Sequence, residues 1–138
     1  MTALRIAAAL TSLDEVAHFC HELAERAGLT PEAAYRLRLA TDELATNVVM
    51  HGYRGGEGEL RLAGGMDEET VWIRLEDDAP PFDPAAGCKP PTPDVPLAKR
   101  PIGGLGIHLA ITALDDFSYR YADGRNRSTL VLRRHRTE

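Results

Sequence analysis

The chain has 138 residues, 43% of them hydrophobic and 27% charged, which is typical of one ordinary globular domain. Its net charge of −5 argues against nucleic acid as a partner, because phosphate backbones bind basic surfaces. No run of 18 apolar residues is present, so we expect no membrane span. Nor does the start of the chain have the basic flank of a signal peptide. The two cysteines lack a metal-ligand spacing and favour a reducing cytoplasm.

The first part of the chain predicts a strand followed by two helices. Leu4–Leu10 is apolar apart from one arginine and is expected to be a strand. Ser12-Leu13-Asp14-Glu15 has the pattern of a capping box, which predicts a helix that Gly28 ends. Thr30 precedes a proline and should cap a longer helix that runs to about Met50.

The second part predicts two strand pairs separated by a long loop and a helix. Seven of the nine prolines lie between residues 80 and 96, where neither a regular helix nor a central strand can continue. The order of elements favours an α+β domain, in which helices cover one face of a mostly antiparallel sheet. The predicted segments are Glu59–Ala63, Val71–Leu75, Gly104–Leu114, Phe117–Tyr121 and Ser128–Arg133, with a turn at Asp123-Gly124-Arg125-Asn126.

A carboxylate and an amide stand four residues apart in the longer predicted helix. Glu43 and Asn47 therefore project side by side. Oxygen ligands suit Mg²⁺, which takes one or two protein ligands together with substrate phosphates. Asn47 would then bind the metal, and Glu43 could accept a proton from an attacking hydroxyl. Taken alone, the pair is more typical of a polar helix face in water than of a metal site.

Glycines open the last predicted helix, in the segment Gly103-Gly104-Leu105-Gly106. Without side chains, the backbone N–H groups can approach phosphate oxygens, and the helix dipole favours their negative charge. A flexible hinge with a packing glycine explains the same residues. Between the two motifs, Asp77 follows a strand and can accept a hydrogen bond from an exocyclic amine such as that of adenine. An isolated aspartate at this place is also a common turn initiator.

Taken in order along the chain, these motifs resemble the histidine-kinase-like ATPase superfamily, and within it the bacterial anti-sigma-factor serine kinases. The resemblance covers nearly the whole chain and is carried by the segments Asp42–Tyr53, Pro81–Pro84 and Gly103–Leu109. It implies a single ATP-binding domain over residues 1–138. The implied fold is the Bergerat type, a two-layer α+β sandwich whose mostly antiparallel or mixed sheet is covered on one face by helices.

The resemblance also implies roles for individual residues. Glu43 corresponds to the general base, Asn47 to the Mg²⁺ ligand and Asp77 to the adenine-binding carboxylate, while residues 84–101 correspond to the ATP lid. Ala79 stands where the family usually has a glycine, and its methyl group would crowd the purine or shift the backbone. The remaining implied nucleotide contacts are Gly103, Gly104, Leu105, Gly106 and Thr129. From their position and charge, Lys99 and Arg100 are expected to reach the γ-phosphate.

By this resemblance the chain is expected to be a cytoplasmic serine protein kinase that uses ATP and Mg²⁺. Its implied substrate is a STAS-type antagonist, and its other implied partners are a sigma factor or related regulator and a second copy of itself. Two alternatives stay open. Ala79 favours a non-catalytic, ATP-gated binding module of a partner-switching pathway. The detached catalytic domain of a sensor histidine kinase is disfavoured, because His18 and His21 fit surface positions better than a dimerisation helix.

Overall fold

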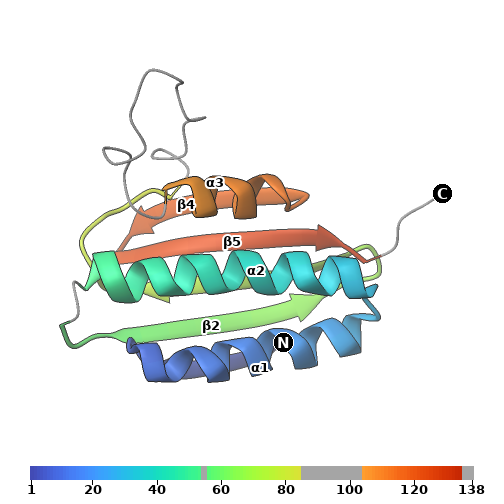
Figure 1. Ribbon diagram of the computed structural model, residues 1–138, viewed down its shortest axis with the longest axis horizontal. Helices are drawn as coiled ribbons and strands as arrows, with labels where there is room; N and C mark the ends of the chain where they lie inside the picture. Colours follow the sequence, from blue (N-terminus) through green and yellow to red (C-terminus); the bar gives the residue numbers. More distant parts are fainter. Residues whose placement is uncertain (54–55, 85–103, 135–138) are drawn as a thin grey trace, which may run out of the picture.

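The computed structural model describes residues 1–53, 56–84 and 104–134. In this part of the chain, helices α1, α2 and α3 lie side by side across one face of a five-stranded sheet (Figure 1). The elements are β1 (Thr2–Ala7), α1 (Leu13–Ala27), α2 (Pro31–Asn47), β2 (Glu59–Met66), β3 (Thr70–Asp77), α3 (Gly104–Thr112), β4 (Asp116–Ala122) and β5 (Arg125–Arg133). This arrangement confirms the predicted two-layer α+β architecture.

The sheet has the strand order β1-β2-β3-β5-β4, and every neighbouring pair is antiparallel. Strand β5 begins at Arg125, three residues before the predicted start at Ser128, so Asn126 belongs to a strand and not to a turn. Only Asp123 and Gly124 make the reversal, and both have positive φ angles. In the β3–β5 register, Asn126 stands opposite Asp77, which places the end of β3 beside the start of β5.

The hydrophobic core lies between the sheet and the helices. Strands β2, β3 and β5 alternate between buried and partly exposed positions, because successive side chains point to opposite faces of a sheet. Helix α2 contributes its apolar stripe to the centre of this layer (Figure 1). The largest fully buried side chains include Val16, Cys20, Leu23, Leu37, Leu60, Leu62, Ile73, Leu130 and Leu132.

The other face of the sheet carries alternating arginines and acidic residues. Arg61 donates two hydrogen bonds to the carboxylate of Asp78, at 2.9 and 3.1 Å, and a third to Glu59 at 3.1 Å. One strand further on, Arg127 pairs with Glu76 at 2.9 Å. These ion pairs hold polar side chains flat on a surface that the helices leave uncovered.

The ends of the first two helices show which local predictions hold. Gly28 ends α1 in the left-handed region, at φ 67°, and the Thr30 hydroxyl accepts the Ala33 N–H at 3.2 Å, as predicted. The predicted capping box at Ser12 is wrong, because its side chain makes no capping hydrogen bond. A 3₁₀ turn over Leu10–Ser12 places Ser12 in a helical conformation, whereas a capping residue needs an extended one.

Helix α2 continues beyond Asn47 as one π-helical turn, η2 (Val48–Gly52). Tyr53 follows it, and its hydroxyl donates to the carbonyl of Glu59 at 2.9 Å and accepts the N–H of Asp78 at 2.8 Å. The end of α2 is therefore tied to the residue that follows β3. Wide helical turns of this kind occur frequently at functional sites.

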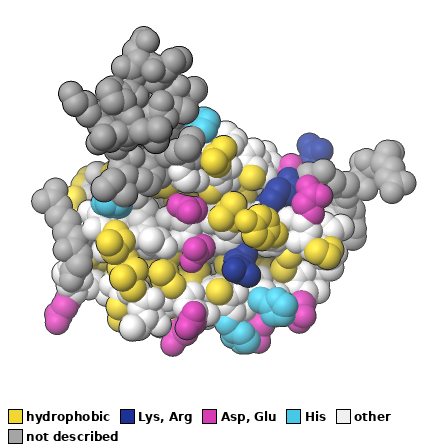
Figure 2. Space-filling model, viewed as in Figure 1, with side chains coloured by type: hydrophobic (Ala, Val, Ile, Leu, Met, Phe, Trp, Pro, Cys, Tyr) yellow, Lys and Arg dark blue, Asp and Glu magenta, His cyan; other side chains and the backbone are white. Residues whose placement is uncertain are grey.

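The outward surface of the helices is mixed in character. Figure 2 shows exposed hydrophobic side chains in separate groups among acidic and histidine side chains. Tyr35, Met50 and Leu109 are among the exposed large hydrophobic residues. His18 and His21 are exposed at the surface of α1, as expected. None of the helices in the described residues is long and apolar enough for a membrane crossing.

Candidate functional site

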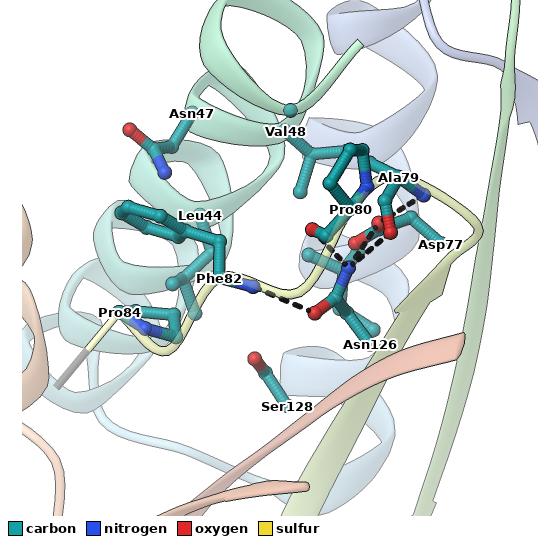
Figure 3. Close-up of a pocket in the computed structure, with 12 residues that line it drawn as sticks. Leu44, Asn47, Val48, Asp77, Ala79, Pro80, Phe82, Pro84, Asn126 and Ser128 are labelled. Carbon is teal, nitrogen blue, oxygen red and sulfur yellow. Dashed lines mark hydrogen bonds between the residues drawn. The ribbon is translucent and has the colours of Figure 1, made fainter. Parts of the chain in front are cut away.

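A pocket lies where the end of α2, the end of β3 and the start of β5 come together (Figure 3). The space among its lining residues amounts to about 370 Å³ with open solvent included, of which only about 20 Å³ is room for the centre of a water molecule. Most of its wall is apolar, and a few polar groups point into it, which is the usual build of a small-molecule site. The lining residues are Leu44, Asn47, Val48, Gly52, Leu75, Asp77, Ala79, Pro80, Phe82, Pro84, Asn126 and Ser128.

Asp77 places a carboxylate deep in this pocket. It is the last residue of β3 and is 4% exposed. Its Oδ1 accepts hydrogen bonds from the N–H of Ala79 and from Nδ2 of Asn126, both at 2.9 Å. Burial raises the pKa of Asp77 above its ordinary value, and the hydrogen bond from Asn126 opposes that rise. Both hydrogen bonds found within the described residues go to one oxygen, so the other can serve a ligand.

Asn126 organises the segment that follows Asp77 (Figure 3). Its Nδ2 lies 3.0 Å from the carbonyl of Ala79 and 3.1 Å from that of Pro80, in addition to Asp77. Its Oδ1 accepts the N–H of Phe82 at 3.1 Å and the hydroxyl of Tyr119. Asn126 is only 6% exposed, so these hydrogen bonds take the place of hydrogen bonds to water.

Sequence reasoning assigned Asn126 to a turn and missed this role. Asn126, Ser128, Leu130 and Leu132 alternate along the chain, which is the pattern of one strand with a single inward face. That alternation was the available signal. It extends the strand back to Asn126 and marks an inward-facing amide that needs partners.

Ala79 packs its methyl group toward the end of the π-helical turn. It is 4% exposed, and a Cβ built on Gly52 would lie 3.2 Å from the Cβ of Ala79. Because Gly52 has no side chain, there is room beside it for the methyl group of Ala79. Ala79 also lines the pocket, so it contributes to the apolar wall as well as to the backbone that Asp77 binds.

Glu43 lies directly against the first turn of α3. A Cβ built on Gly106 would stand 2.7 Å from Oε2 of Glu43 and 3.1 Å from its Cδ. The absence of a side chain at Gly106 lets the Glu43 carboxylate occupy this position, and α2 and α3 pack against each other. The carboxylate and the start of the glycine-rich helix therefore share one side of the molecule, as the sequence predicted.

Asn47 follows Glu43 by one helical turn and lines the pocket itself, with its amide at the rim in Figure 3. Within the described residues, no group of three or more histidine, cysteine, aspartate or glutamate side chains is arranged to hold a metal ion. An amide beside a carboxylate fits a Mg²⁺ ion that takes most of its ligands from phosphates and water. Asn47 and the neighbouring carboxylate are thus suited to a metal that arrives with a nucleotide.

The structure does not bring every predicted residue to the pocket. Thr129 lies on the opposite face of the sheet, because side chains alternate along β5, and its neighbour Ser128 lines the pocket instead. The expectation that Thr129 touches the adenine is therefore corrected. Gly104 and Leu105 form the first turn of α3. Gly103, Lys99, Arg100 and residues 85–101 of the expected lid lie outside the described residues.

The chain is similar to known proteins in sequence and in fold. A family model described as the histidine kinase-like ATPase domain matches residues 6–133. The serine-protein kinase RsbW of Listeria innocua is 32% identical over 108 residues, covering 74% of this chain and 68% of that protein. RsbW of Bacillus cereus is 28% identical over 105 residues, with 74% and 66% covered. The histidine kinase AdeS of Acinetobacter baumannii is similar in fold, with a TM-score of 0.54 at 16% identity, covering 99% of this chain and 70% of that one.

Proposed function

Because the chain belongs to the histidine kinase-like ATPase domain family, we propose that it is an ATP-dependent serine protein kinase of the anti-sigma type. The observation that carries the proposal is the pairing of two features on one side of the molecule. A buried carboxylate, Asp77, lies at the bottom of an apolar pocket, and a second carboxylate, Glu43, lies against a glycine at a helix start.

In this proposal the adenine of ATP enters the pocket between Leu44, Ala79 and Phe82. Its exocyclic amine donates to the free oxygen of Asp77, since a carboxylate can only accept. The triphosphate extends toward the first turn of α3, where N–H groups and the helix dipole favour negative charge. Asn47 would hold Mg²⁺, which neutralises phosphate charge when bound.

The proposed reaction moves the γ-phosphoryl group of ATP to a serine hydroxyl of a partner protein and releases ADP. Glu43 accepts the hydroxyl proton as the new O–P bond forms, and the bond to the β-phosphate oxygen breaks. Such catalysis depends on positioning and charge neutralisation more than on covalent chemistry by the enzyme. We propose a STAS-type antagonist as the substrate and a sigma factor or related regulator as the second partner, bound by a homodimer in the cytoplasm.

Transfer of labelled γ-phosphate to a purified STAS-type antagonist tests the kinase. Glu43→Gln should lower the transfer rate by roughly 10²- to 10⁴-fold, the usual contribution of a general base. The matched control is Glu32→Gln, the same change in the exposed first turn of α2, which should leave transfer unchanged. Unchanged transfer in Glu43→Gln would remove Glu43 from the role of base.

A non-catalytic, ATP-gated binding module is the second candidate, and Ala79 is the observation that favours it. Ala79 stands where the family usually has a glycine, and it adds a methyl group to the pocket wall. Titration calorimetry with ATP and Mg²⁺ separates the candidates when it is combined with the transfer assay. Binding without transfer supports the module, whereas binding with transfer supports the kinase.

A further inference from the structure

We propose that Asn126 is the positioning residue that sets the base specificity of the pocket, because it fixes Asp77 as a hydrogen-bond acceptor. The inference rests on the proposed function, since it concerns the base of the nucleotide that the pocket takes. It starts from the dense set of hydrogen bonds around one buried amide (Figure 3).

The orientation of the Asn126 amide follows from partners that cannot change their role. The N–H of Phe82 can only donate, so the atom that it meets at 3.1 Å is the amide oxygen. The carbonyls of Ala79 and Pro80 can only accept, so the atom that they meet at 3.0 and 3.1 Å is the amide nitrogen. Asn126 therefore presents an N–H group to Asp77.

This fixed N–H group constrains Asp77 in two ways. Together with the N–H of Ala79, it occupies Oδ1, so the carboxylate plane is held and Oδ2 is the oxygen available to a ligand. It also favours the ionised carboxylate, against the effect of burial. An ionised carboxylate oxygen accepts hydrogen bonds and cannot donate them.

The chemical consequence is a choice between purines. Adenine carries an amine donor at the position where hypoxanthine and guanine carry a carbonyl acceptor. The acceptor Oδ2 can bind the amine of adenine. With hypoxanthine or guanine, the carbonyl of the base would face Oδ2, and two acceptors cannot form a hydrogen bond. If Asp77 took up a proton, its O–H group could donate to the carbonyl, and the pocket could then bind both kinds of base.

Tyr119 supports the same orientation from the neighbouring strand. Its hydroxyl donates to Oδ1 of Asn126 and accepts the N–H of Phe82 at 3.2 Å. Ser118 is adjacent in β4 but is exposed on the opposite face of the sheet. The pair therefore offers a hydroxyl that belongs to the network and a nearby hydroxyl that does not.

The test compares the dissociation constants of ATP and inosine triphosphate, each with Mg²⁺, by titration calorimetry on the whole chain. The wild type should prefer ATP by roughly 10- to 150-fold, the range for a hydrogen bond to a charged group. Asn126→Ser should bring this preference below about 3-fold, mainly by weakening ATP binding. Tyr119→Phe should lower the preference to an intermediate value, and Ser118→Ala should leave it unchanged.

The ratio of the two constants separates positioning from a general structural effect. A variant that only loosens the pocket weakens both nucleotides by the same factor, so an unchanged ratio in Asn126→Ser and Tyr119→Phe overturns the inference. Equal binding of both nucleotides by the wild type also overturns it. Failure of the wild type to bind either nucleotide refutes the proposed function itself, which is a different result. If Asn126→Ser does not fold, Tyr119→Phe decides the matter alone.

Discussion

Replacing Gly106 with alanine perturbs the candidate site at one defined contact. The new Cβ would lie 2.7 Å from Oε2 of Glu43, whereas ordinary contacts begin near 3.4 Å. The carboxylate must therefore withdraw by roughly 0.7 Å, which is the difference between these two distances. It sits at the end of a flexible side chain, so this movement requires no rearrangement of the backbone.

The expected result is a loss of activity without a loss of stability. Alanine is favoured over glycine inside a helix by about 1 kcal/mol, so Gly106→Ala should keep Tm or raise it by a few degrees. A displacement of about 1 Å in a catalytic group lowers rates by roughly 100-fold. We therefore expect phosphoryl transfer to the antagonist to fall by about that factor, measured with labelled ATP.

A double-mutant cycle shows whether the effect passes through Glu43. If it does, Gly106→Ala combined with Glu43→Gln should transfer phosphate no more slowly than Glu43→Gln alone. Two effects that multiply would mean that the methyl group blocks the phosphates directly. Full activity in Gly106→Ala would refute the reasoning, because no active carboxylate can occupy its present position beside that methyl group.

Three further predictions concern the described part of the chain. Thr30→Ala should lower the free energy of unfolding by about 1 kcal/mol in urea titrations, whereas Ser12→Ala should have little effect, because only Thr30 makes a capping hydrogen bond. Burial raises the pKa of Asp77, so the folded state holds this proton more tightly than the unfolded state, and stability should decline as pH rises through the raised pKa. Asp77→Asn should therefore stabilise the nucleotide-free protein at neutral pH, and an equal pH dependence in both proteins would contradict this. Burial raises the pKa of Cys20 to about 11, so its thiol should resist alkylation at pH 8 until the protein is unfolded, as followed by mass spectrometry.

The sequence predicted those helix ends that depend only on residues a few positions away. Gly28 and Thr30 act on residues three or four positions away, and both positions match the prediction. Ser12 has the same local pattern but follows a 3₁₀ turn, and this turn depends on how the chain leaves β1 for α1. A four-residue motif carries no information about that geometry.

Part of the candidate site was predictable because the spacing and type of its residues along the chain are enough to indicate their place. Glu43 and Asn47 share a helix face because they are four residues apart. Gly106 matters because it has no side chain where the Glu43 carboxylate lies. Asn126 was missed because its importance comes from pairing with Asp77, which lies 49 positions earlier in the chain. Strand register decides that pairing, and a shift of one residue would have turned the amide to the opposite face.

The central claim is that the pocket lined by Asp77 takes the adenine of ATP. Titration calorimetry of ATP and Mg²⁺ into the wild type and Asp77→Asn tests it most directly. In the variant, Oδ1 can still accept its two hydrogen bonds, but an amide NH₂ replaces the oxygen that faces the amine. The account predicts that the wild type binds ATP and that Asp77→Asn binds it at least 10-fold more weakly, as expected when a hydrogen bond to a charged group is lost. Equal affinity of the two folded proteins for ATP would contradict the account.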